Sequence, residues 1–147
     1  MQPSANFVID GPTFEIIRQV TTEIPNFRGT LMSEQGWTYE IDRFLCGVVR
    51  SLPWDLNPGS WVRISIVEET DLLPEIPPKP ELPLEAGEEA VRYIPSHICE
   101  LWPRLLNVAW VGLGPLEARY RTGYHESEIT TALATFTDSI RSALKGR

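Results

Sequence analysis

Residues 68–89, EETDLLPEIPPKPELPLEAGEE, differ sharply in composition from the residues on either side of them. This segment holds five of the thirteen prolines and eight of the twenty acidic residues, and Lys79 is its single base. The rest of the chain has twelve acidic and twelve basic residues, so the formal net charge of −7 comes from this segment alone. Prolines at 74, 77, 80 and 83 recur every third residue, which is the repeat of a polyproline II helix. The sequence therefore predicts a stiff, extended, acidic arm.

The parts that flank the arm are each short for a hydrophobic core of their own, so the 147 residues predict one domain over 1–147. A hydrophobic share of 42% and an aromatic share of 10% are ordinary for a folded globular protein. The N-terminus lacks the pattern of a secretory signal, and no apolar run approaches the roughly 20 residues of a membrane span. We expect a cytoplasmic protein in which Cys46 and Cys99 are buried free thiols.

Before the arm, the pattern predicts a short strand at residues 6–10 and a helix that begins after Asp10 and ends before Pro25. Residues 29–32 are expected to form a connector or a brief strand. The clearest helical signal covers residues 37–52, where Gly47 suggests a close neighbour on that face of the helix. The apolar stripe of this helix is Trp37, Ile41, Phe44, Leu45, Val48, Val49 and Leu52.

Residues 61–67, WVRISIV, alternate as a half-buried strand does. After the arm we expect a turn or two of helix at 88–93 and a short helix at 96–101. Residues 105–113 and 116–121 are interpreted as a β-hairpin around a turn at 112–115, with a helix over 105–111 as the alternative. The chain then ends in an amphipathic helix over about 127–145.

These elements predict the α+β class. We expect a small, mostly antiparallel sheet with the two longer amphipathic helices, 37–52 and 127–145, packed on one face. The acidic proline-rich arm interrupts this arrangement between the strand at 61–67 and the C-terminal part of the chain.

Three interpretations of the arm are open. It can be a tether between the two parts, or a ligand for an SH3-type groove through residues 74–79, PEIPPK. It can also be a fixed acidic surface that attracts a basic protein, because clustered like charge speeds association with the opposite charge. The residues assigned to partner binding are Glu75, Pro77, Lys79, Glu81, Glu85 and Glu88, with Trp54 as an aromatic anchor.

A second cluster of side chains suitable for chemistry precedes the last helix. A histidine oriented by a carboxylate can act as a general base, and arginines beside aromatic rings can hold an anion. The simpler interpretation is an exposed strand followed by the approach to a helix. The alternative ligand site predicted here consists of Arg119, Arg121, Tyr124 and His125.

Other chemistries receive little support. His97, Cys99 and Glu100 lack the paired spacing of a zinc site, and no cofactor motif is present. The GLGP stretch at 112–115 lacks the lysine and the flanking pattern of a phosphate-binding loop. Nucleic acid and membrane surfaces are not expected partners, because no basic run or basic helix face occurs.

The leading hypothesis is therefore a small acidic protein-binding protein, in its most specific form an inhibitor or immunity-like protein that engages a basic partner through 68–89. The first alternative is a small enzyme or anion-binding domain centred on Arg121, Tyr124 and His125. The second alternative is a subunit of a larger assembly, in which exposed tryptophans mark the interface.

Overall fold

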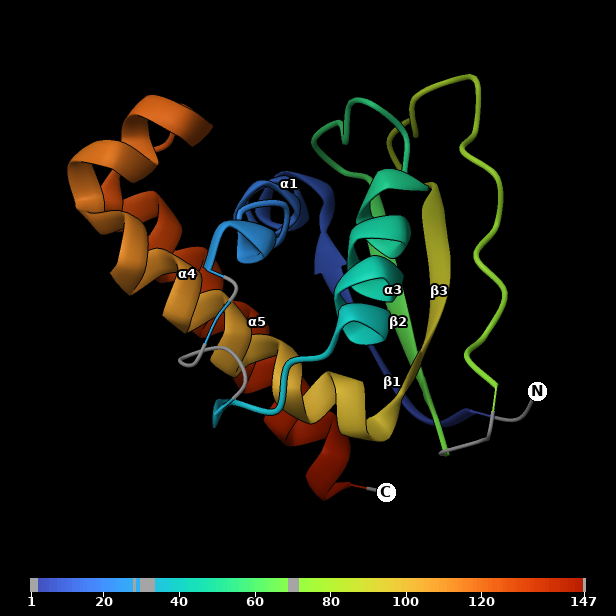
Figure 1. Ribbon diagram of the computed structural model, residues 1–147. Coiled ribbons are helices and arrows are strands. Elements are labelled where there is room, and N and C mark those ends of the chain that lie inside the picture. The colour runs from blue at the N-terminus through green and yellow to red at the C-terminus, as the bar shows by residue number, and fades with distance from the viewer. Residues whose placement is uncertain (1–2, 28, 30–33, 69–71, 147) are drawn as a thin grey trace.

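The computed structural model describes residues 3–27, 29, 34–68 and 72–146. Apart from Gly29, the connector or strand expected at 29–32 lies outside these residues. Figure 1 shows the arrangement of the helices and strands. In chain order they are β1 (Pro3–Asp10), α1 (Gly11–Thr21), the 3-10 turn η1 (Ile24–Phe27), α3 (Tyr39–Arg50), β2 (Trp61–Val67), β3 (Glu89–Pro95), α4 (Ser96–Thr122) and α5 (Glu126–Lys145).

The three strands form one sheet in the order β1-β2-β3. β1 pairs with β2 antiparallel, and β2 pairs with β3 parallel, so that Trp61 lies beside Glu89 and Val67 beside Pro95. The α+β class is confirmed, with a mixed sheet where we expected a mostly antiparallel one. Parallel strands run in the same direction, so after β2 the chain must return to the end of the sheet at which β2 began. This crossover connection is usually a helix. Here the acidic segment is that crossover.

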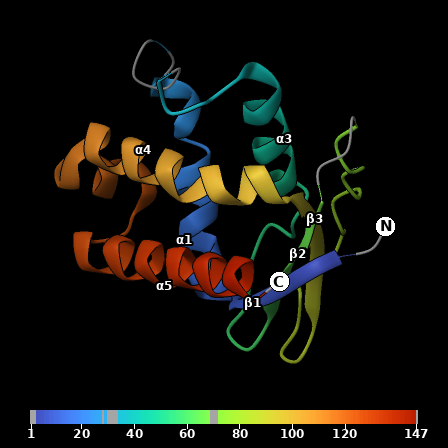
Figure 2. The same cartoon turned by 90° about the horizontal axis from the view of Figure 1, so that it is seen from below.

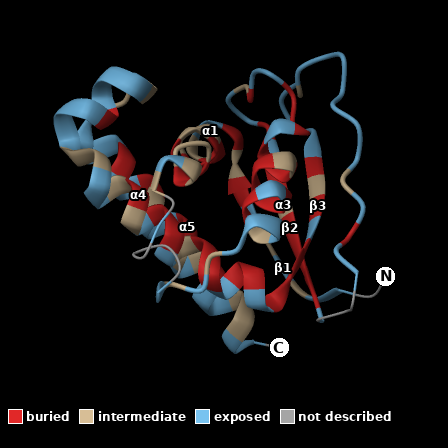
Figure 3. Cartoon of the chain, viewed as in Figure 1, coloured by how far each residue is buried: buried red, intermediate tan, exposed pale blue. Residues whose placement is uncertain are grey.

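One face of the sheet carries the core. Val62, Ile64 and Ile66 of β2 are completely buried there, as the alternation of the sequence predicts. Figure 3 shows the buried residues concentrated between the sheet and the helices. The opposite face is more open, since Trp61 and Tyr93 are each 41% exposed.

The helices pack on the buried face. α1, α4 and α5 contact one another, and Figure 2 shows α4 and α5 running side by side. The ring of Phe136 on α5 meets Phe7 of β1 edge to face, with the ring centroids 6.1 Å apart. Trp102 of α4 is fully buried against Phe136, and its indole N–H donates to Thr21 Oγ1 at 3.0 Å. The amphipathic helices at 37–52 and 127–145 are thus confirmed as α3 and α5.

The helix start after Asp10 is also confirmed. The Asp10 carboxylate accepts a hydrogen bond from the Thr13 backbone N–H at 3.1 Å, and Pro12 lies in the first turn. An N-cap oxygen of this kind satisfies one of the donors that a helix start leaves unpaired.

The hairpin expected from residues 105–121 is wrong. These residues belong to α4, which runs from Ser96 to Thr122 and also replaces the short helix expected at 96–101. Leu101, Leu105 and Ala109 are buried at helical spacing, although the surrounding apolar run resembles a strand. Gly114 has φ 76° and ψ 161°, so the helix is kinked where a turn was expected.

The helical turn expected at 88–93 is wrong as well, because these residues enter β3. Ala90, Arg92 and Ile94 are buried on alternate positions. The charge of Arg92 interrupts the apolar pattern by which a strand is recognised, and this explains the error.

Candidate functional site

The described part of the crossover, residues 72–88, follows an extended path beside β3 and α3, on the side away from α4 and α5 (Figure 1). Its first half rests on α3 through two apolar side chains. Pro74 is buried, and Ile76 is half-buried against Gly47. A Cβ on Gly47 would lie 2.7 Å from Ile76 Cδ1, so the glycine provides the space that this contact needs. The close neighbour that Gly47 suggested is therefore a residue of the arm.

The second half of the crossover is hydrogen-bonded to the turn that precedes β2. Asn57 Nδ2 donates to the Leu84 carbonyl at 2.9 Å, and Gly87 N donates to the Gly59 carbonyl at 2.9 Å. Trp61 N then donates to the Glu88 carbonyl at 3.0 Å, where the strand pairing begins. These hydrogen bonds hold the arm at the end opposite to the Ile76 contact.

Trp54 and Lys79 form a third point of attachment. Trp54 is 78% exposed, and Lys79 Nζ lies 4.6 Å from the centroid of its ring. A cation at this distance over an indole face is attracted by the ring quadrupole. The single base of the segment is therefore directed toward the body of the domain.

The backbone under Trp54 is held from α1. The guanidinium of Arg18, which is only 8% exposed, donates to the Pro53 carbonyl at 2.6 Å and to the Trp54 carbonyl at 2.8 Å. It also pairs with Glu15 one turn earlier on the helix. This buried arginine therefore holds the backbone from which the exposed indole projects.

The four glutamates assigned to partner binding all face solvent. In the described part of the chain none of their carboxylates has an ion-pair partner, and Glu88 Oε1 accepts only from the Glu85 backbone N–H, at 2.9 Å. Pro77 is exposed as well. The crossover thus combines an attached inner side with an acidic outer side. The acidic members are Glu75, Glu81, Glu85 and Glu88.

The SH3-type interpretation meets a geometric obstacle. Of the residues in its pattern, Pro74 is buried on the α3 side and Lys79 is on the Trp54 ring. An SH3-type groove that binds both Pro74 and Lys79 would have to displace them from the domain.

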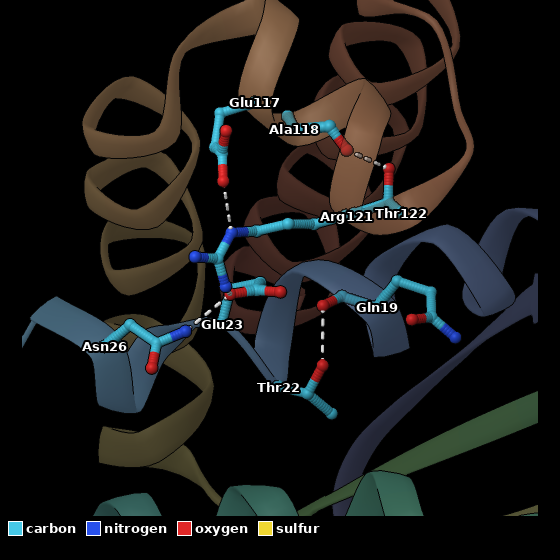
Figure 4. Close-up of polar contacts among 8 residues, drawn as sticks. All are labelled: Gln19, Thr22, Glu23, Asn26, Glu117, Ala118, Arg121 and Thr122. Carbon is cyan, nitrogen blue, oxygen red and sulfur yellow. Dashed lines mark hydrogen bonds and ion pairs between the residues drawn. The ribbon is translucent and has the colours of Figure 1, made fainter.

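The alternative ligand site lies at the far end of α4 and in the loop before α5. Arg121 donates from Nε to Glu117 Oε1 at 2.8 Å and contacts Glu23 Oε2 at 3.4 Å (Figure 4). These carboxylates raise the pKa of Arg121 above its ordinary value, the Glu117 hydrogen bond being the larger cause. The guanidinium therefore links the end of α4 to the turn after α1.

The other members of this site lie on the surface. Arg119 and His125 are exposed and contact each other, with Arg119 Nη1 2.7 Å from His125 Nε2. Tyr124 is half-buried, and burial, followed by the charges of Glu15 and Glu128, raises the pKa of its hydroxyl. The structure brings the four residues into one region, but none of them lines any of the five main pockets of the described residues.

The remaining candidate residues from the sequence differ in their exposure to solvent. His97 and Glu100 are exposed, whereas Cys99 and Cys46 are buried. Of the five tryptophans, Trp54 and Trp61 are exposed, and Trp102 is fully buried. Among the residues that the structure describes, no helix has both the length and the apolar character needed to cross a membrane.

Comparison of the chain with protein-family models, with curated proteins and with solved structures gave no match. The arm and its surroundings are therefore the features from which a function can be inferred. Sequence reasoning identified Trp54 and Lys79 but missed Arg18 and Arg50, which lie beside them. These arginines come from two different helices, and no spacing in the sequence connects them to the arm.

Proposed function

We propose that this chain is a protein-binding protein that engages a basic partner through the acidic side of segment 68–89. In its most specific form it is an inhibitor or immunity-like protein that covers a basic cleft of its target. The observation that carries the proposal is the set of four exposed glutamates that have no ion-pair partner among the described residues, on a segment attached to the domain at three points.

The attachment matters energetically. A flexible acidic tail loses conformational freedom when it binds, whereas a segment already held in an extended form loses much less. Clustered charge raises the association rate and selects partners of opposite sign. Trp54, exposed beside the arm, supplies the kind of aromatic anchor on which interface affinity commonly depends.

The test begins with capture of partners from the native cells on the tagged protein, with elution by rising salt. We expect a basic protein that is released as salt screens the charges. The same capture with Glu75, Glu81, Glu85 and Glu88 all changed to lysine is expected to lose this protein. Equal capture by wild type and by the folded quadruple variant would overturn the proposal.

A matched pair of variants separates the site from net charge. The first double variant combines Glu81→Lys with Glu85→Lys, and the second combines Glu34→Lys with Glu100→Lys. Both double variants change the net charge from −7 to −3 at exposed positions. Once the partner is purified, we expect the first pair to weaken binding by at least about tenfold, because each reversal places like charges in contact. The second pair is expected to have a small effect, and equal losses would refute a role for the arm.

A further inference from the structure

A pocket of about 320 Å³ lies beside the Trp54 ring, where the arm meets the body of the domain. Residues from α1, from the end of α3, from the turn after it and from the crossover line this pocket together. The charged and aromatic members of the lining are Glu15, Arg18, Arg50, Trp54, Asp55 and Lys79. The volume is at the small end of the range for ligand pockets.

The charges of Arg18 and Glu15 are already paired within the wall of the pocket. Arg18 and Glu15 neutralise each other, and Arg18 is already bonded to the carbonyls of Pro53 and Trp54. Glu15 also accepts from Gln19 Nε2 at 3.2 Å. This wall is therefore fixed and close to neutral.

The remaining charges favour an anion. Arg50 and Lys79 are positive, Asp55 is negative, and the other three lining residues are uncharged, which leaves a net charge of about +1. Arg50 is exposed at the end of α3, and within the described residues its side chain has no hydrogen-bond or ion-pair partner. A positive site on a chain of net charge −7 is distinct from the acidic surface beside it.

Trp54 adds the second half of the recognition. The Trp54 indole is 78% exposed, so most of its aromatic surface is not stabilised by burial. The Trp54 backbone is nevertheless held in place by Arg18. A planar ligand on this indole would recover apolar contact, and Arg50 and Lys79 would hold its charge.

We propose that this pocket binds a small organic anion, with a carboxylate or phosphate group at Arg50 and Lys79 and a planar body on Trp54. The site shares Trp54 and Lys79 with the proposed partner surface, whereas Arg50 lies outside the acidic segment, so substitution of Arg50 tests the pocket alone. Because Lys79 belongs to the arm, bound ligand would contact the arm and the domain at once.

The probes are phenyl phosphate, benzoate, benzamide and inorganic phosphate, titrated into the ¹⁵N-labelled full chain. The indole N–H signal of Trp54, assigned from its loss in Trp54→Phe, reports binding. We expect phenyl phosphate or benzoate to shift it saturably, and the tighter of the two identifies the charged group. Neutral benzamide is expected to leave it unchanged, and inorganic phosphate is expected to bind more weakly than phenyl phosphate.

Arg50→Gln should weaken the binding of the aromatic anions by at least about tenfold, because a hydrogen bond to a charged group is lost. Arg104→Gln removes another exposed helix arginine, one that does not line the pocket, and should leave the binding of these anions unchanged. The proposal is overturned if no anion shifts Trp54, if benzamide binds as well as benzoate, or if both arginine variants bind like wild type. None of these results bears on the proposal that the acidic arm binds a protein, because the glutamate-to-lysine variants test that proposal separately.

Discussion

Two buried arginines from different elements hold the backbone between α3 and β2. Arg92 of β3 donates from Nε to Ser51 Oγ at 2.7 Å and from Nη2 to the Ser51 carbonyl at 2.9 Å. Arg18 of α1 donates to the carbonyls of Pro53 and Trp54. Residues 51–54 are thus held from two sides, and this support fixes the backbone that carries the Trp54 indole.

Replacement of Arg92 tests this support at the residue scale. Burial lowers the pKa of Arg92 below its ordinary value, so the buried charge itself is costly, although an arginine stays protonated in the accessible pH range. Arg92→Met removes that cost but leaves the Ser51 carbonyl without its donor. We expect a net loss of about 1–3 kcal/mol in the free energy of unfolding, measured by urea denaturation.

Arg92→Lys serves as the control, since it keeps the charge but cannot reproduce the two-pronged contact with Ser51. Its stability should fall between those of wild type and Arg92→Met. A methionine variant as stable as wild type would show that these hydrogen bonds contribute no net stability.

At the scale of elements, two helix glycines permit close packing of quite different neighbours. Gly47 on α3 faces the end of the Ile76 side chain, which can rotate away. Gly112 on α4 faces the ring of Phe27, and an added Cβ would lie 2.8 Å from Cδ1 and 3.0 Å from Cζ. A rigid ring has fewer ways to move than an aliphatic terminus.

Alanine at these two positions should therefore differ in effect. Each substitution gains about 1 kcal/mol of helix propensity. In Gly47→Ala this gain should roughly offset the shift of Ile76, whereas Gly112→Ala should be less stable by about 1–2 kcal/mol, because overpacking commonly costs about 1–3 kcal/mol. Thermal unfolding of the two variants side by side measures the difference, and equal stabilities would contradict this packing argument.

At the scale of the whole molecule, the proline-rich segment closes a parallel strand pair without a helix. Prolines are unsuited to a helix interior but lose little entropy in an extended crossover, because their φ is already fixed in the unfolded chain. Pro77, Pro78, Pro80 and Pro83 are exposed, so they contribute through this stiffness more than through packing.

Changing these four prolines to alanine should lower the free energy of unfolding by about 1.5–4 kcal/mol, since each such change costs about 0.4–1 kcal/mol. Urea denaturation gives the value, and an unchanged circular dichroism spectrum would show that the fold is retained. Unchanged stability would mean that the crossover is not held in its extended form.

Much of the fold was predictable where one face of an element is apolar throughout. β2, α3 and α5 have regular hydrophobic periods, and their expected bounds were close to those observed. α4 was missed because its continuous apolar run conceals the helical period, and β3 because a buried charge breaks its alternation. Of the candidate sites, Trp54, Lys79 and the four glutamates were named from the sequence, whereas Arg18 and Arg50 were not.

The sequence by itself determined the α+β class, the extended acidic segment and the location of the net charge, because these depend on composition and on local periods. Only the tertiary structure decided that this segment is a crossover between parallel strands, that its lysine rests on Trp54, and that a cationic pocket lies beside an acidic surface. These features join residues far apart in the chain, and local periodicity carries no information about which distant backbone groups and charges meet.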